Sequence, residues 1–345
     1  MSFADAMMAK LNDGATCLML SIGHRTGLFD CMSAMEPASS KEIAARAELN
    51  ERYVREWLDA MTVSGVCHYD ADQKTYFLPK VHAEFLTRKS TLPNFAVMAQ
   101  FIGMLGSVED KIVNCFQNGG GVDYTDFHRF HEIMAEESGQ TVLPALIDSI
   151  IPLADGLREK LESGITVADV GCGRGRAIRK MGRAYPKSKF TGFDIGEDAI
   201  GHANDETGDE GLKNVEFKVQ DVAKMEFEDE FDLITAFDSI HDQAQPDVVL
   251  ANIYKALKPG GIFLMQDIGT SKYVEQNMEH PVAPLIYTIS CMHCMTVSLA
   301  QGGAGLGAAW GVETAKEMLI EAGFKKVETH KLDHDPLNCF FVVEK

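Results

Sequence analysis

Basic residues are scarce in this chain relative to acidic ones. Its 345 residues include 32 Lys and Arg against 51 Asp and Glu, so the formal net charge is -19 at pH 7. A negative surface repels polyanions, and binding to a phosphate backbone depends on cationic side chains. Nucleic acids and acidic membranes are therefore not expected as partners.

The chain also lacks the features of a secreted or membrane-spanning protein. We expect no signal peptide, and the eight cysteines are scattered without the spacing of a disulfide framework. The longest apolar stretch, Pro281 to Ala300, carries two prolines, Tyr287, His293 and several hydroxyls, so we interpret it as a buried helix or pocket lining. A reducing, cytoplasmic location is the simplest expectation.

A complete zinc motif is missing as well. Cys291-Met292-His293-Cys294 offers two thiols and one imidazole, but the sequence has no second C-x-x-C and no paired histidines to complete four ligands. We therefore predict no bound metal.

The most informative segment that is present runs from Val167 to Arg176. A buried strand is followed by Gly171, Gly173 and Gly175, which permit positive φ and close approach of a ligand to the backbone. The helix that opens after this turn offers unpaired N–H groups to that ligand. A dinucleotide fingerprint needs a small residue at position 176, where this chain has Arg176, so NAD is disfavoured.

Acidic residues follow three successive predicted strands. Asp194 ends the strand from Phe190 to Ile195, where a ribose-binding acid is expected, and Asp221 follows the strand from Val215 to Val219. Asp169 precedes the glycine turn. The carboxyl ends of parallel strands share one edge of a sheet, so all three acids are expected at one ligand site.

The first ninety residues predict a winged helix-turn-helix unit. An apolar helix over about 15–29 is followed by helices capped at Ser39 and Asn50, and by a hairpin over 66–78. In the third helix Arg52 and Arg55 are offset by acids, which favours dimerisation over DNA binding. Residues 91–160 predict a helical connector and lid, broken by a hinge at 119–121, with the aromatic run around Tyr124 folded over a site.

From residue 165 onward, predicted strands and helices alternate. Further strands are expected at 231–237 and 262–267, with a helix between them that stops at Lys258-Pro259-Gly260-Gly261. A last helix is expected to be capped at Thr314 and to stop at Gly323, before two closing strands. This alternation predicts a parallel α/β sheet covered by helices on both faces, with an antiparallel edge.

These features together resemble the class I S-adenosylmethionine-dependent methyltransferases that carry an N-terminal winged-helix dimerisation domain, including small-molecule O-methyltransferases and relatives of undefined substrate. The resemblance rests on the winged helix, the helical connector, Asp169-x-Gly171-x-Gly173-x-Gly175, Asp194, Asp221, His241-Asp242 and Lys258-Pro259-Gly260-Gly261. One departure is Gln243, where tryptophan is usual. The resemblance implies a Rossmann-like, seven-stranded methyltransferase sheet over 161–345, a mostly helical winged-helix domain over 1–90, and a homodimer.

The resemblance also implies roles for individual residues. The backbone at 171–175 would hold the methionine part of S-adenosylmethionine, Asp194 the ribose, and Asp221 with Val222 the adenine. The remaining expected cofactor-binding residues are Asp169, Ile195, Phe237 and Asp238. The expected substrate-binding residues are Tyr124, Cys291, Met295 and Trp310.

His241 is the candidate catalytic base. It follows the fourth strand at the same sheet edge as the acids, and an imidazole can take a proton from a hydroxyl or thiol near neutral pH. The predicted reaction is methyl transfer to an O or S atom of a small, apolar acceptor. Alternatives are a thiol or metalloid methyltransferase that relies on positioning without a base, a ligand-sensing DNA-binding regulator, and a purely structural His241.

Overall fold

The computed structural model describes residues 1–90 and 92–345. It divides into two compact units, Met1–Ser107 with Glu132–Gln140, and Val108–His131 with Thr141–Lys345. The stretch expected as a separate connector, whose first residue lies outside the described residues, is thus shared between the units. The segment at 132–140 joins the first unit because His24 Nε2 lies 3.0 Å from Glu136 Oε2, and Asn94 N–H donates to Gln140 Oε1 at 2.6 Å.

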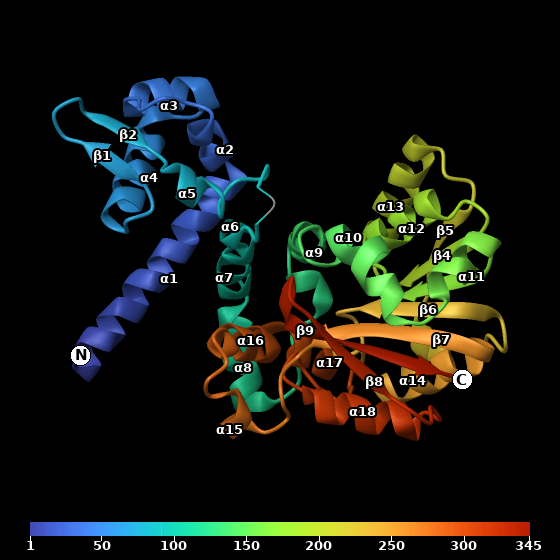
Figure 1. Cartoon of the computed structure of the whole chain (residues 1–345). Coiled ribbons are helices and arrows are strands. Elements are labelled where there is room, and N and C mark those ends of the chain that lie inside the picture. The colour runs from blue at the N-terminus through green and yellow to red at the C-terminus, as the bar shows by residue number, and fades with distance from the viewer. Residues whose placement is uncertain (91) are drawn as a thin grey trace. The chain divides into compact units, whose positions relative to one another are not determined.

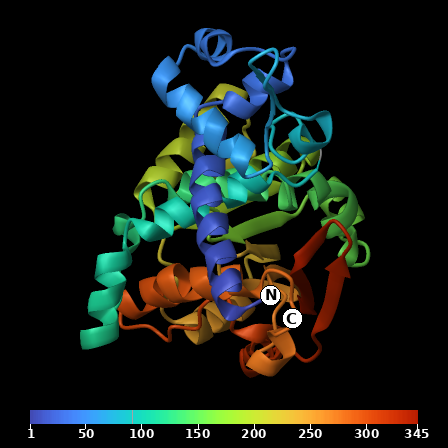
Figure 2. The same ribbon diagram turned by 90° about the vertical axis from the view of Figure 1, so that its left-hand side faces the viewer.

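The first unit is mostly helical and carries a two-stranded wing (Figures 1 and 2). Its elements are α1 Phe3–Arg25, α2 Leu28–Ser33, α3 Ser40–Ala47, α4 Glu51–Val63, β1 His68–Asp70, β2 Thr75–Phe77, α5 Lys80–Ala83, α6 Phe95–Met98 and α7 Gln100–Gly106. Strands β1 and β2 pair antiparallel. The order of helices followed by a hairpin confirms the predicted winged-helix architecture.

The first helix is longer than the sequence pattern predicted. Helix α1 begins at Phe3 because Ser2 and Asp5 form a capping box, and the chain leaves it at Gly27, whose φ is 72°. The predicted continuation to residue 29 is therefore wrong, and Leu28 and Phe29 start α2 instead.

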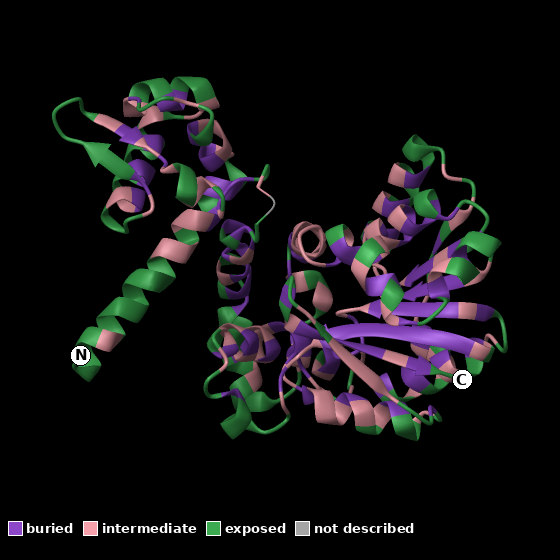
Figure 3. Cartoon of the chain, viewed as in Figure 1, coloured by how far each residue is buried: buried purple, intermediate pink, exposed green. Residues whose placement is uncertain are grey.

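Helix α4 anchors the core of this unit. The predicted capping box of Ser39 with Glu42 and the Asn50 cap are both present, so α3 and α4 begin where the sequence indicated. The apolar stripe of α4 is buried, and Trp57 packs edge-on against Phe29 while its Nε1–H donates to Met19 O at 2.9 Å. Figure 3 shows this buried interior within an exposed surface.

The second unit is built on a seven-stranded sheet of order β5-β4-β3-β6-β7-β9-β8. The strands are β3 Thr166–Val170, β4 Lys189–Asp194, β5 Val215–Val219, β6 Phe231–Phe237, β7 Leu257–Ile268, β8 Glu328–Leu332 and β9 Asp335–Glu344. Strands β3 to β7 pair in parallel, and β9 runs antiparallel to both β7 and β8. The predicted Rossmann-like methyltransferase sheet is confirmed.

Helices cover both faces of this sheet (Figure 1). On one face, α14 (Pro246–Ala256) and α18 (Gly311–Glu321) pack in one core cluster. On the other, α11 (Leu157–Ser163), α12 (Arg176–Ala184) and α13 (Glu197–Glu210) pack in a second. The inner strands β3 and β6 are largely buried, as in parallel sheets generally, whereas the outer strands β5 and β8 are partly exposed (Figure 3).

Two boundaries in this unit differ from the sequence prediction. Helix α18 begins at Gly311, three residues before the predicted Thr314 cap, because Val312 N–H donates to Thr270 O and Glu313 accepts from Lys272 N–H. The run 258–261 lies inside β7 rather than at a helix end, since α14 already stops at Ala256. In both places tertiary contacts decide the boundary.

The remaining elements of the second unit are short helices. They are α8 Glu109–Asn118, η1 Tyr124–Asp126, α9 Phe130–Ser138 (which continues into the first unit), α10 Val142–Ala145, η2 Leu146–Ile150, η3 Ile151–Leu153, η4 Val222–Lys224, α15 Val274–Asn277, α16 Ala283–Ile289, η5 Ser290–Cys294 and α17 Met295–Ala300. The elements α16, η5 and α17 run without a break, and by length and composition alone Ala283–Ala300 could cross a membrane. In the structure His293 and Cys294 of this stretch are buried, which accords with a buried helix.

The glycine run at 119–121 lies inside the second unit rather than at a hinge between units. Gly121 touches α17 so closely that a Cβ there would lie 2.0 Å from Thr296 O and 2.3 Å from Ala300 N. The next residue, Val122, donates its N–H to Thr296 Oγ1 at 2.9 Å. This close approach fixes the start of the aromatic segment that follows.

Candidate active site

The glycine turn after β3 has the conformation that the sequence predicted. Gly171, Gly173 and Gly175 have φ values of 69°, 51° and 68°, a region that side chains with a Cβ rarely adopt. A Cβ on Gly171 would lie 2.4 Å from Ser239 Cβ, and one on Gly175 would lie 2.2 Å from the Phe217 ring. The turn is therefore a cradle that any larger residue would fill.

Asp194 ends β4 and holds this turn in place. Its Oδ2 accepts the N–H of Gly173 at 2.8 Å, and its Oδ1 accepts the N–H of Gly196 at 2.8 Å. The next residue, Ile195, is 59% exposed. The carboxylate thus lies beside the glycine turn at the carboxyl edge of the sheet, where a ribose acceptor was predicted.

Asp221 lies at the end of the neighbouring strand. It caps η4 by accepting from Ala223 N–H at 3.0 Å, and Lys224 Nζ is 2.9 Å from its Oδ2. Gln220 N–H donates to Asp194 O at 2.8 Å, which ties the ends of β4 and β5 together. Val222 is buried in the core under the sheet. The structure brings Asp194 and Asp221 to one edge, and their ligand roles stay predictions.

Asp169 is the second-last residue of β3 and is buried. Its Oδ1 accepts from the Thr235 hydroxyl at 2.6 Å, and burial raises the pKa of its carboxyl to about 7. The Thr235 hydrogen bond works against this rise, and the nearby Asp194 charge adds to it. Asp169 therefore links β3 to β6 through Thr235 as a carboxyl that is partly protonated at neutral pH.

This elevated pKa predicts a pH-dependent stability. The folded protein binds more protons than the unfolded chain between about pH 4 and 7, so Asp169 destabilises the fold increasingly as pH rises through this window. Asp169→Asn keeps an acceptor for Thr235 and removes the charge. The difference in free energy of unfolding between Asp169→Asn and wild type should grow by roughly 2 to 3 kcal/mol from pH 5 to pH 8. Urea unfolding at both pH values measures it, and an equal difference at both would contradict the prediction.

The loop after β6 lies against the glycine turn. Ser239 donates its hydroxyl to Val170 O at 2.7 Å, next to Gly171. Phe237 ends β6, and Asp238 has a left-handed φ of 49° and accepts from Gln266 Nε2 at 3.0 Å. Gln243 donates to Ser239 O at 2.9 Å and so closes the loop at the position where tryptophan is usual in the resembling enzymes. This loop carries His241.

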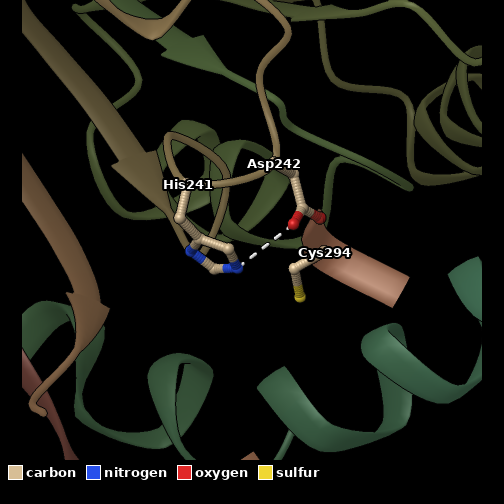
Figure 4. A group of neighbouring side chains, drawn as sticks. All are labelled: His241, Asp242 and Cys294. Atoms are coloured by element: carbon tan, nitrogen blue, oxygen red, sulfur yellow. Dashed lines mark ion pairs between the residues drawn. The ribbon is translucent and has the colours of Figure 1, made fainter. Parts of the chain in front are cut away.

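His241 is buried and is held between two carboxylates. Its Nδ1 lies 2.7 Å from Asp267 Oδ1, and its Nε2 lies 3.3 Å from Asp242 Oδ1. Burial of the ring disfavours its charged form, but the charges of Asp267 and Asp242 outweigh that and hold the pKa of His241 well above its usual value. One ring nitrogen is thus engaged, and the other faces Asp242 and Cys294 (Figure 4).

Asp267 is a site residue that the sequence analysis missed. It lies near the end of β7, fully buried, and its Oδ1 also accepts from Trp310 Nε1 at 3.0 Å and from Ile268 N–H at 2.8 Å. An acid at the carboxyl end of a further parallel strand was the available signal. Trp310, predicted to line the substrate pocket, is buried in the core and donates to Asp267, and its substrate role stays a prediction.

Aromatic rings gather around Tyr124, the first predicted substrate-binding residue. Tyr124 lies 5.2 Å from the Phe130 ring and 5.5 Å from His293 between centroids, and His293 stacks on Phe130 at 3.9 Å. Phe127 packs on His293 at 4.6 Å. Burial, with the charges of Asp242 and Asp194, raises the pKa of Tyr124. The ring cluster is therefore near both the glycine-turn acid and the His241 loop.

Of the three sulfur-containing residues considered in this region, one lies beside His241 and the other two do not belong to that group. Cys294, which the sequence analysis did not select, is buried beside His241 and Asp242. Cys291 is half-buried in η5, and Met295, half-buried at the start of α17, lies near Gly307. The sequence spacing could not tell which thiol faces the site, because the π-helical turn η5 shifts the usual helical phase.

Comparison with known proteins identifies both parts of the chain. An Rv2258c-like winged HTH domain matches residues 14–88, and a methyltransferase domain matches residues 161–323. A curated sterol 24-C-methyltransferase of Kluyveromyces lactis is 31% identical over 173 residues, which is 49% of this chain and 43% of that protein. The aligned part thus spans less than half of that relative.

Solved structures share the fold over the full length. Human N-acetylserotonin methyltransferase in complex with SAM has a TM-score of 0.73 at 17% identity, covering 100% of this chain and 98% of its own. PigF with SAH has a TM-score of 0.75 at 19% identity, covering 100% of both chains. Identities this low show a common fold.

Proposed function

Because this chain belongs to the class I S-adenosylmethionine-dependent methyltransferases with an N-terminal winged-helix domain, we propose that it transfers a methyl group to an O or S atom of a small, apolar acceptor. The class of enzyme and the cofactor predicted from the sequence are thereby confirmed. The acceptor and its reacting atom are the proposal.

The observation that carries the proposal is the His241–Asp267 pair next to the glycine cradle. Ser239 joins the two, since it packs on Gly171 two residues before His241. Because His241 follows Ser239 by two residues, it can take the acceptor's proton while the glycine turn holds the cofactor. Asp267 orients the ring through Nδ1, so that Nε2 lies on the side of Asp242 and Cys294.

The chain's residues then have separate tasks. S-adenosylmethionine supplies, when bound, an electrophilic methyl carbon and a neutral leaving sulfide. The backbone of the glycine turn and Asp194 position it, and positioning alone can remove ~7 to 11 kcal/mol of a barrier in the best cases. His241 in its neutral form accepts the acceptor's proton at Nε2, and the carboxylate of Asp267 stabilises the imidazolium that results.

The rings around Tyr124 support an apolar acceptor. Phe127 and Phe130 are buried, and they cover His293 from two sides. An acceptor that packs against these rings is expected to be flat and apolar rather than charged. Tyr124, Cys291 and Met295 stay predictions as substrate-binding residues.

An acceptor screen tests the function. Purified protein is incubated with S-adenosylmethionine and panels of phenols, small thiols and carboxylates, and methylated products are detected by mass. We expect products from phenols or thiols. Methylation of no member of these panels by protein that binds S-adenosylmethionine would contradict the proposal, and activity on thiols that survives loss of His241 would favour transfer by positioning alone.

A homodimer is proposed through α1. Phe3, Met7, Leu11, Leu18 and Ile22 are exposed, and they fall within about 100° around the helix, which makes a continuous apolar stripe. A stripe of this kind on a surface helix indicates a partner surface. Within α4, Arg55 lies 3.5 Å from Glu51 and Arg52 pairs with Glu56, so its cations are neutralised, which disfavours DNA as the partner.

The dimer has its own test. Leu11→Glu with Leu18→Glu should place two carboxylates in the stripe and halve the mass measured by light scattering. Tyr53→Glu, at an exposed position on α4 of the same unit, should leave the mass unchanged. A wild-type monomer, or equal dissociation in both variants, would contradict the assignment of α1.

The eight cysteines are all free thiols in the structure. We propose on this basis, together with the scattered Cys spacing, that the enzyme works in the cytoplasm.

A further inference from the structure

Three different metal-ligating side chains meet beside the aromatic cluster. His241, Asp242 and Cys294 each offer a ligand atom, and these atoms all lie within 4.8 Å of one another. Figure 4 shows the imidazole, the carboxylate and the thiol converging from the loop after β6 and from η5. We propose that these three side chains bind one zinc-like divalent ion with a fourth position open to water.

The spacing of the donors fits a tetrahedral ion. Zinc bonds of about 2.1 Å to nitrogen and oxygen imply a ligand-to-ligand edge of about 3.4 Å. The His241 Nε2 to Asp242 Oδ1 distance is 3.3 Å. With a zinc–sulfur bond of about 2.3 Å, the tetrahedral distance from sulfur to nitrogen or oxygen is about 3.6 Å. Because the three ligand atoms lie within 4.8 Å of one another, the Cys294 sulfur would have to move by about 1.2 Å at most.

An outer shell already orients the imidazole ligand. Metal-bound histidines almost always donate their other ring N–H to a carboxylate, a carbonyl or water. His241 does so to Asp267 at 2.7 Å, and Asp267 is fixed in turn by Trp310 and by the Ile268 amide. This arrangement directs the Nε2 lone pair toward Asp242 and Cys294.

Unpartnered polar atoms point to a missing ligand at the same place. Among the described residues, Asp242 Oδ1 is buried and has no hydrogen bond, although it lies 3.3 Å from His241 Nε2. His293 has no exposed surface and neither of its ring nitrogens has a hydrogen bond within the described chain, while its Nδ1 lies 3.9 Å from Asp242 Oδ2. Buried polar groups are normally satisfied, so an ion or its bound water accounts for this cluster.

The donor set selects the kind of ion. A thiolate with an imidazole and a carboxylate suits Zn²⁺ or Co²⁺, whereas Mg²⁺ and Ca²⁺ prefer oxygen ligands alone. The ligands come from positions 241, 242 and 294, so no local spacing motif announces them. Binding releases the thiol proton and any proton on His241 into the buffer.

With His241 as the base of the proposed function, on which this expectation rests, metal binding competes with proton transfer. One lone pair at His241 Nε2 cannot hold both a proton and a metal. Zinc should therefore inhibit base-assisted methyl transfer.

Metal binding is tested without any methyl donor or acceptor. The full-length protein, freed of metal by a chelator and dialysed, is titrated with Zn²⁺ by calorimetry, and with Co²⁺ while thiolate-to-cobalt absorption is followed. We expect one ion per chain and a charge-transfer band. Asp242→Asn and Cys294→Ala should each weaken Zn²⁺ binding at least tenfold, and Cys294→Ala should abolish the band.

Cys291→Ala is the matched control, because Cys291 lies in the same π-turn but outside the three-residue group. It should bind Zn²⁺ as wild type does, and circular dichroism should show all variants folded. Wild-type binding that neither Asp242→Asn nor Cys294→Ala weakens, or equal losses in Cys291→Ala, would overturn the site. Failure here leaves methyl transfer untouched, since that is measured separately by the acceptor screen.

Discussion

Replacing His241 by asparagine should lower kcat for methyl transfer by ~10²- to 10⁴-fold, the usual contribution of a general base. The amide of the introduced side chain can still donate to Asp267, so the loop should keep its shape. Binding of S-adenosylmethionine should stay within about twofold of wild type, because the glycine turn and Asp194 are untouched. Steady-state kinetics with the best acceptor from the screen, and calorimetry for the cofactor, measure both quantities with chelator present.

The pH profile distinguishes a base from a structural histidine. Asp267 and Asp242 hold the pKa of His241 above its usual value, so in metal-free enzyme the ring loses its proton in a higher pH range than a free imidazole does. The wild-type rate should therefore rise with pH in that range. Asp242→Asn removes one of these charges and should move the rise to lower pH. A profile that is identical in His241→Asn would remove His241 from the mechanism.

Asp194→Ala should weaken S-adenosylmethionine binding by on the order of 10²- to 10⁴-fold. The two hydrogen bonds expected between the ribose hydroxyls and the Asp194 carboxylate are lost, at ~1.5 to 3 kcal/mol each. The substitution also frees the N–H groups of Gly173 and Gly196, so the turn loses its support. Calorimetric titration measures the change.

Glu197→Ala is the control for this substitution. Glu197 is an exposed acid at the start of α13, three residues from Asp194, and its loss changes the net charge equally. It should bind the cofactor like wild type. Wild-type affinity in Asp194→Ala would contradict the predicted ribose site, and equal losses in both variants would indicate a general charge effect.

The sequence predicted those parts of the site that are local in the chain. A glycine turn at the end of a strand, and acids at strand ends, are written in consecutive residues, and the parallel topology brings them together. Asp267 escaped because its role depends on pairing with His241, 26 residues earlier in the chain. Cys294 escaped because the choice between two thiols depends on a π-turn that composition does not reveal.

Helix boundaries failed where distant contacts override local preference. The Thr314 box is a sound cap pattern, yet α18 starts earlier because Glu313 accepts hydrogen bonds from the Ser271 hydroxyl and from Lys272 N–H. The start of α1 depended on Ser2 and Asp5, a pair ahead of the apolar pattern. The inner strands of the second unit were predictable because they are apolar runs that alternate with helices, whereas the start of β7 at Leu257 was not.

The close contact of Gly121 with α17 limits how this enzyme can be redesigned. Any side chain at 121 would collide with backbone atoms of residues 296 and 300, and so would push the segment carrying Tyr124 away from α17. Libraries that aim to change acceptor size should therefore vary positions 124, 127 and 130 and hold 121 as glycine. In the proposed acceptor site, a larger acceptor has to be accommodated by smaller side chains at these three positions, because the contact of Gly121 with α17 fixes the start of the segment that carries them.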